Sequence, residues 1–202
     1  MARRSAPDVN AGSMADIAFL LLIFFLVTTT IETASGISMK LPQWQDEEQE
    51  PPVIRQRNIF TVLINRNNEL LVEDEEMEIG DLRQAAFEFL DNGGGTGDEA
   101  CDFCQGSGDP DLSVNPQKAI ISLANNRGTE YGTYIAVQNE LVAAYNELRD
   151  REAHRLFGKS FTELNDAYKD PNYNGNKENL KEQIDAIKDL IPQKLSEAEP
   201  TS

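Results

Sequence analysis

The chain is poor in the residues that most enzymes use for catalysis. It contains one histidine, two cysteines and one tryptophan among 202 residues. No P-loop, HExxH zinc-protease motif or G-x-S-x-G nucleophile elbow occurs in it. The single histidine, His154, lies among charged residues of a helical pattern, so we expect it at the surface. We therefore expect no enzymatic activity, no cofactor and no metal site.

Basic residues are also scarce. The sequence has 18 Lys and Arg against 35 Asp and Glu, which gives a formal net charge of -17 and a pI of about 4.4. A field of this sign repels phosphate backbones, so we expect no nucleic-acid binding. With 40% hydrophobic and 26% charged residues, the composition suits a folded chain. The length allows one ordinary domain with extensions.

Long apolar runs are absent except near the N-terminus. Residues 17–31 carry no charge, and the densest apolar part covers residues 17–27. A cleavable signal peptide is disfavoured because Asp8 and Asp16 separate the basic Arg3 and Arg4 from this run. Fifteen helical residues reach only about 22 Å, so we expect a transmembrane helix that extends backward and covers residues 12–31.

This extension places Asp16 within the membrane. A carboxylate at mid-bilayer costs on the order of 2.5–3.5 kcal/mol, and intramembrane acids normally face partner groups or water. Apolar surroundings favour the neutral acid and polar surroundings the carboxylate, so such a group can take up and release a proton. The alternative is that Asp16 marks the membrane edge or caps the helix. Arg3 and Arg4 predict that residues 1–11 are cytoplasmic and that the remaining chain lies outside.

Beyond the membrane the sequence predicts a linker and a mixed α/β fold. Residues 37–42 alternate like a short strand, and residues 43–57 are acidic and proline-containing, which is typical of an extended tether. We therefore expect a linker over residues 32–57 and a small folded domain over residues 58–202. The domain is predicted to have two layers in an α+β arrangement. The expected order is a hairpin (59–64 and 70–72), a helix from residue 80, a strand (119–123), a long helix (131–156) and a last strand near 193–199.

Two segments of the predicted domain lack a clear pattern. Residues 91–116 are rich in Gly, Asp and Pro, which predicts a long surface loop. Residues 157–179 give mixed signals, with a loop at 170–175. Leu180, Ile184 and Ile187 then mark a short amphipathic helix.

The apolar segment and the residues C-terminal to it resemble the ExbD/TolR family. Residues 14–28, Met-Ala-Asp-Ile-Ala-Phe-Leu-Leu-Leu-Ile-Phe-Phe-Leu-Val-Thr, are similar to the start of the only membrane helix in that family, which opens with an Asp flanked by hydrophobic residues. Residues 37–42, which end in Leu-Pro, and the element order over 59–150 resemble its periplasmic part. The segments at about 91–116 and 151–190 are insertions relative to short members and are similar to those of Bacteroidetes versions.

The resemblance implies a cell inner-membrane protein with a periplasmic domain that couples the proton motive force to outer-membrane transport. Its implied partners are a second copy in a homodimer, multi-span ExbB-like channel subunits and a TonB-like periplasmic protein. Asp16 is then the protonatable carboxylate, driven by roughly 2.3 kcal/mol per charge per 100 mV. Thr30 is a candidate for the outer mouth of the proton path, although hydroxyls that bond back to their own helix are the favoured interpretation.

Strand addition to an open sheet edge is the simplest way for the domain to bind a partner. The candidate partner-binding residues are Ile37, Met39, Leu41 and Pro42, and residues 193–199 offer a second candidate edge. The acidic surface favours a basic partner segment.

Two alternative functions stay open at the level of sequence. One is a TolR-like component of the Tol-Pal system, which constricts the envelope. The other is a passive, signal-anchored envelope adaptor in which Asp16 is incidental.

The two cysteines lie in a CxxCxGxG unit at residues 101–108. An oxidising periplasm favours a local disulfide between Cys101 and Cys104. Two thiolates are half of a tetrahedral zinc site, which a dimer could complete. The acids around them lack the spacing of an EF-hand loop, so a solvated loop is the better interpretation.

Overall fold

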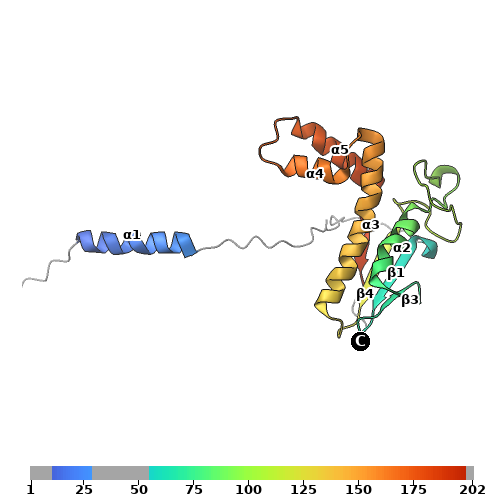
Figure 1. Ribbon diagram of the computed structural model, residues 1–202, viewed down its shortest axis with the longest axis horizontal. Helices are drawn as coiled ribbons and strands as arrows, with labels where there is room; N and C mark the ends of the chain where they lie inside the picture. The colour runs from blue at the N-terminus through green and yellow to red at the C-terminus, as the bar shows by residue number, and fades with distance from the viewer. Residues whose placement is uncertain (1–10, 29–54, 199–202) are drawn as a thin grey trace, which may run out of the picture. The chain divides into compact units, whose positions relative to one another are not determined.

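The computed structural model describes residues 11–28 and 55–198 (Figure 1). The chain divides into two compact units, Met1–Glu50 and Pro51–Ser202, which are described separately. Within the described residues, no helix combines the length and the apolar character that a membrane crossing requires.

The first unit contributes one described helix, α1 (Ala11–Thr28). Its large apolar side chains are exposed on every side, so it has no amphipathic face to bury against a core. Asp16 is the only charged residue in it.

A five-stranded sheet forms the centre of the second unit, in the order β3-β2-β1-β4-β5. The strands are β1 (Ile59–Ile64), β2 (Leu70–Val72), β3 (Glu75–Met77), β4 (Ile120–Asn125) and β5 (Leu195–Glu197). β2 pairs antiparallel with β1 and β3, whereas β4 and β5 continue the sheet in parallel. The predicted hairpin, middle strand and last strand are confirmed. β3 was not predicted.

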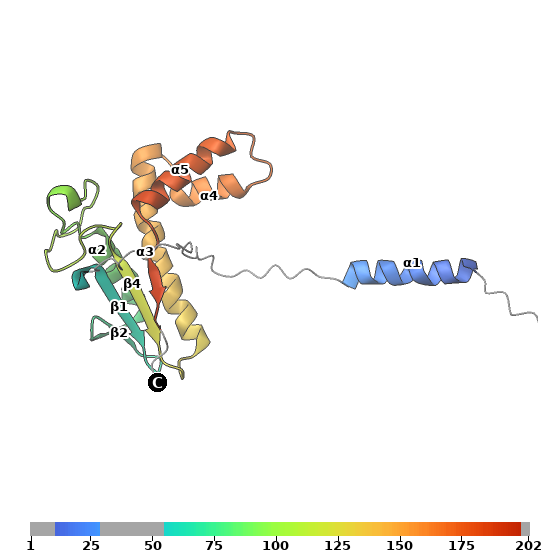
Figure 2. The same cartoon turned by 180° about the vertical axis from the view of Figure 1, so that it is seen from behind.

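Two helices, α2 (Ile79–Asp91) and α3 (Tyr131–Phe157), cover one face of this sheet, as Figure 2 shows from the strand side. The side chains of Val62, Ile121 and Leu123 point into this layer and are fully or almost fully buried. Both helices begin within one residue of the predicted position. The predicted mixed α/β fold is therefore confirmed.

Two further helices pack against the C-terminal end of α3. They are α4 (Phe161–Lys169) and α5 (Lys177–Leu190). α5 contains the predicted amphipathic pattern, whereas α4 was missed. α4 begins with a capping box, in which the Ser160 side chain accepts from the Glu163 backbone and the Glu163 side chain accepts from the Ser160 backbone.

The segment between α2 and β4 is a loop, as predicted, and it is packed more closely than a solvated loop. It contains a short 3-10 turn, η2 (Gly97–Glu99), and it buries Ser113 and Val114 completely. A second 3-10 turn, η1 (Gln56–Asn58), precedes β1. The Asn58 side chain accepts a hydrogen bond from the Val114 backbone, which joins the loop to the start of the sheet.

Candidate functional site

The protonatable residue predicted from the sequence, Asp16, lies in the second turn of α1. Its neighbours Ile17 and Leu20 are apolar and more than half exposed. No ion pair joins Asp16 to any residue in the described part of the chain. Asp16 is thus the one charged side chain of a helix whose remaining residues are apolar apart from Gly12, Ser13 and Thr28.

The other predicted site residues are Thr30, Ile37, Met39, Leu41 and Pro42. All five lie outside the described residues, so their roles stay predictions.

Among the residues that the structure describes, no strand pairs with the outer side of β3 or of β5, and β5 matches a predicted candidate edge. The Ile121 N–H donates to the Lys194 carbonyl and the Ala198 N–H donates to the Leu123 carbonyl, both at 2.9 Å. Alternate peptide groups of a strand face the same neighbour, so those of Leu195 and Glu197 face away from β4. They leave backbone donors and acceptors on the outer side of β5.

Helix α3 holds β5 in place from one face of the sheet. The Tyr134 hydroxyl donates to Glu197 Oε1 at 2.6 Å, and the Tyr145 hydroxyl donates to the Lys194 carbonyl at 3.3 Å. Burial, with the hydrogen bond to Glu197, raises the pKa of Tyr134, so this donor stays protonated throughout the physiological range. The edge is therefore supported by two fixed hydroxyl groups.

The opposite edge, β3, is acidic. Glu75 and Glu76 are exposed, and the turn before them places Glu73 and Asp74 at φ values of 50° and 70°. Charged side chains on an edge strand oppose pairing with an apolar strand. The two edges therefore differ in the partner segments that they accept.

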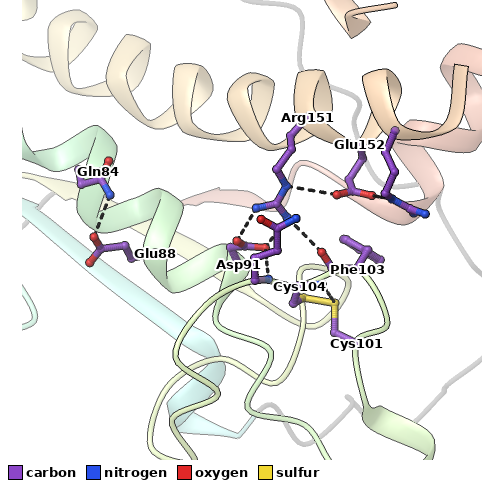
Figure 3. A network of polar contacts seen from close by, with 10 residues as sticks. Gln84, Glu88, Asp91, Cys101, Phe103, Cys104, Arg151 and Glu152 are labelled. Atoms are coloured by element: carbon purple, nitrogen blue, oxygen red, sulfur yellow. Dashed lines mark hydrogen bonds and ion pairs between the residues drawn. A yellow bond between two sulfur atoms is a disulfide. The ribbon is translucent and has the colours of Figure 1, made fainter. Parts of the chain in front are cut away.

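A partly buried ion pair anchors the loop between α2 and β4 to α3 (Figure 3). Arg151 donates from its two Nη atoms to the two carboxylate oxygens of Asp91, at 2.5 and 2.6 Å, and donates to the Phe103 carbonyl at 3.2 Å. The hydrogen bonds to Asp91 raise the pKa of Arg151. Glu152, which is fully buried, accepts from Arg151 and from Arg155. The bidentate geometry of the Arg151–Asp91 pair fixes the orientation of both side chains.

A disulfide joins Cys101 and Cys104 beside this ion pair, with a Cα–Cα distance of 5.5 Å. The predicted local disulfide is confirmed. Because it uses both sulfur atoms, the alternative of a shared zinc site is not supported. Within the described residues, no group of three or more His, Cys, Asp or Glu side chains is placed to hold a metal ion.

Asn92 organises the rest of the loop. Its amide nitrogen donates to the carbonyls of Asp109 and Ser113 at 2.9 and 2.8 Å. Its amide oxygen accepts from the Ser107 hydroxyl at 2.9 Å and from the Asp109 backbone at 3.0 Å. This buried amide therefore satisfies both its donors and its acceptor.

The sequence marked Asp91 only as one of the acids around the two cysteines, and it did not indicate the pairing of Asp91 with Arg151 or the role of Asn92. The run of three glycines at residues 93–95 was the sequence signal that could have indicated the close packing of this loop. A Cβ atom at Gly94 would lie 2.2 Å from the Asp109 carbonyl oxygen, and one at Gly95 would lie 2.1 Å from the Glu99 carbonyl oxygen. Consecutive glycines can indicate such a close approach of two backbone segments.

A comparison with models of protein families shows to which family the chain is related. The model described as "Biopolymer transport protein ExbD/TolR" matches residues 2–149, which contain α1, the sheet as far as β4 and most of α3. The chain belongs to the ExbD/TolR family. A search of curated proteins finds no match to it.

Members of the ExbD/TolR family are non-enzymatic accessory proteins of energy transduction. They are single-pass proteins of the inner membrane and generally work with ExbB and TonB partners. The family match ends within α3, so α4, α5 and β5 lie beyond it.

His154, in the last turn of α3, is exposed as predicted.

Proposed function

We propose that this protein is the proton-motive-force-coupled accessory subunit of a TonB-ExbB-ExbD-type complex that powers outer-membrane transport. In this proposal residues 1–11 are cytoplasmic, residues 12–31 cross the inner membrane and the folded domain lies in the periplasm. Membership of the ExbD/TolR family supports a role in energy transduction. The observation that carries the specific proposal is the single carboxylate of Asp16 within the apolar helix α1.

The proton step depends on the surroundings of Asp16. Leu20 and Ile23 lie near the same face of the helix, because residues three or four apart share a face. α1 therefore has no continuous polar path of its own, and the polar groups that receive the proton belong to the ExbB-like channel. Asp16 is neutral against apolar walls and ionised beside polar groups, so its protonation state controls which part of the channel the helix contacts. Thr30 is the proposed hydroxyl at the outer end of this path.

The periplasmic domain couples this proton step to a partner protein. We propose that it works as a homodimer and binds a segment of a TonB-like protein by strand addition. The outward-facing peptide groups of Leu195 and Glu197 support β5 as the receiving edge. Ile37, Met39, Leu41 and Pro42 form the second proposed partner-binding segment.

The test of the proton step is Asp16→Asn, which keeps the size of the side chain and removes its ability to ionise. We expect loss of energised outer-membrane uptake at normal protein abundance. The matched control is Asp8→Asn, which removes the same charge nearer the N-terminus and should leave uptake unchanged. Copurification with a multi-span membrane subunit should survive both substitutions. Full uptake in Asp16→Asn would support the passive adaptor instead.

A TolR-like role in envelope constriction is the second candidate, because the matching family model covers both ExbD and TolR proteins. The two roles differ in the phenotype of a deletion strain. Loss of nutrient uptake with normal division supports the ExbD-like role, whereas delayed outer-membrane constriction with normal uptake supports the TolR-like role.

A further inference from the structure

A surface cavity of about 380 Å³ lies at the N-terminal end of β1, beside α2 and the loop that precedes β4. Neither the proton step nor strand addition to β5 uses it. Its volume is within the range of about 300–1,000 Å³ that is typical of ligand pockets in proteins.

Two aromatic residues of the hydrophobic core, Phe60 and Phe89, lie at the bottom of this cavity, and each is 5% exposed. The rings of Phe60 and Phe89 lie with their centroids 5.0 Å apart and their planes tilted by 34°. Ala85 and Leu112 extend the apolar surface, and Leu112 is 40% exposed although it is a large hydrophobic residue. We call this cavity the Phe60–Phe89 pocket. An aromatic or long aliphatic side chain placed there would remove apolar surface from water.

The rim of the Phe60–Phe89 pocket is acidic. Three carboxylates come from three different segments: Glu73 from the turn between β2 and β3, Glu88 from α2, and Asp111 from the loop. Gln84 donates to Glu88 at 2.8 Å and orients it, as Figure 3 shows. The one basic residue in the lining, Arg57, donates to the Pro110 carbonyl at 2.5 Å. Within the described residues, no ion pair neutralises the three rim acids.

The loop between α2 and β4 supplies one wall of the pocket through Asp111 and Leu112. Asn92 holds this loop at Asp109 and Ser113, on both sides of that wall. The Arg151–Asp91 ion pair fixes its first part to α3. The wall is therefore already in place before any ligand arrives, which lowers the entropic cost of binding.

We propose that the Phe60–Phe89 pocket binds an aromatic or long aliphatic side chain that is flanked by lysine or arginine in a peptide segment of a periplasmic partner. The apolar floor receives the central side chain and the rim carboxylates receive the flanking cations. This proposal rests on the proposed function, in which the domain captures such a partner. It assigns to the first inserted segment, residues 91–116, the role of building a recognition surface.

The test uses the full chain in micelles of an uncharged detergent and three fluorescein-labelled peptides. Their recognition sequences are Gly-Lys-Phe-Lys-Gly, Gly-Glu-Phe-Glu-Gly and Gly-Lys-Ala-Lys-Gly, and binding is measured by fluorescence anisotropy against micelles alone. We expect the Lys-Phe-Lys peptide to bind. The Glu-Phe-Glu and Lys-Ala-Lys peptides should bind at least about fivefold more weakly, because each lacks one half of the complementarity.

Two double variants with the same change in net charge locate the binding site. Glu88→Gln with Asp111→Asn removes two rim charges and should weaken binding of the Lys-Phe-Lys peptide by about fivefold or more. Glu182→Gln with Asp185→Asn removes two exposed charges from α5 and should change binding by less than about twofold. Leu112→Ala should weaken binding of the Lys-Phe-Lys peptide and leave the Lys-Ala-Lys peptide unaffected.

No binding of the Lys-Phe-Lys peptide to the unmodified protein would overturn the proposal, as would an equal loss in the two double variants. The uptake assay separates this failure from failure of the proposed function. If the pocket variants keep uptake while Asp16→Asn loses it, the proposed role of the pocket in partner binding is refuted. The proposed proton step is then still supported. Retained uptake in Asp16→Asn would refute the proposed proton step, whichever result the peptide-binding measurements give.

Discussion

The folded unit contains two hydrophobic cores that share helix α3 and differ in how they are built. The larger core joins the sheet, α2 and the N-terminal part of α3, and it includes Val62, Leu123 and Leu141. The smaller core joins the C-terminal end of α3 to α4 and α5 through Leu164 and Ile187. Strands distant in sequence meet in the first core, whereas the second brings together helices that are neighbours along the chain. We therefore expect the smaller core to open locally while the larger one stays folded.

Arg149 and Leu190 both contact the two cores, and Arg149 does so through polar and cation–π contacts. Arg149 is almost completely buried and donates from Nε and Nη2 to the Ile191 carbonyl at 3.0 and 2.8 Å. Its guanidinium group lies over the rings of Tyr145, of the larger core, and Phe161, of the smaller core, at 5.9 and 5.3 Å from the centroids. Burial lowers the pKa of Arg149. This arginine fixes the chain where α5 turns toward β5.

The comparison of the larger and the smaller core is tested most strongly by making the same substitution in each of them. Leu141 and Leu164 are both fully buried, so Leu→Ala should cost about 2–5 kcal/mol at either position. We expect Leu141→Ala to lower the free energy of global unfolding and to speed hydrogen exchange throughout the sheet. Leu164→Ala should speed exchange chiefly in α4 and α5. Equal effects on the sheet would show that the unit unfolds as one cooperative block and that the two cores are not separable.

Arg149→Ala tests the junction and has the next largest expected effect. It removes both hydrogen bonds to the Ile191 carbonyl and leaves that buried acceptor without them, which should cost about 1–3 kcal/mol. Hydrogen exchange should rise at residues 190–197 and in α4 and α5. Arg155→Ala is the control on the same helix, because Arg155 is half exposed and, within residues 55–198, its one ion pair is with Glu152. If Arg149→Ala changes exchange no more than Arg155→Ala does, the buried arginine does not couple the cores.

Alkaline pH should weaken the larger core through Tyr145. Burial raises the pKa of this tyrosine above its ordinary value of 10.0. Its stabilising contribution is therefore fully present below pH 10 and is lost as the pH rises beyond it, because the unfolded chain ionises first. The contribution of Tyr145 to the slope is at most about 1.4 kcal/mol per pH unit, and Tyr134, whose pKa is also raised, adds to the total. Urea unfolding at several pH values measures it, and Tyr145→Phe should flatten the slope, whereas Tyr168→Phe, at an exposed site, should not.

The smallest expected effect is at the β2–β3 turn, at the far side of the sheet from the second core. Glu73 and Asp74 occupy consecutive left-handed positions that a two-residue hairpin normally gives to Asn and Gly. Asp74→Gly should raise the free energy of unfolding by roughly 0.5–1 kcal/mol, because glycine adopts φ of 70° without steric cost. Thermal unfolding would detect this as a small rise in Tm. Asp81→Gly, within a helix, should lower stability instead.

The larger core was largely predictable from the sequence, and the smaller one was not. The β-branched and aromatic composition of residues 59–64 predicted a strand, and the helical spacing from Tyr134 to Leu148 predicted a helix with one buried face. Both are local properties of the sequence. α4 was not predicted because its apolar pattern is short, although Ser160 and Glu163 carried a capping-box signal. β3 escaped because Glu75 and Glu76 have low strand propensity, and pairing with β2 determines their conformation.

By itself, the sequence determined the apolar helix with its single acid, the acidic balance, the order of the main elements and the local disulfide. These depend on spacing and composition, which act over a few residues. Only the tertiary structure decided that Arg151 reaches Asp91, that Asn92 organises a loop of more than twenty residues, and that Phe60 and Phe89 form the floor of an acidic pocket. Those contacts join residues far apart in the chain, and no local pattern records which distant segment a side chain will meet.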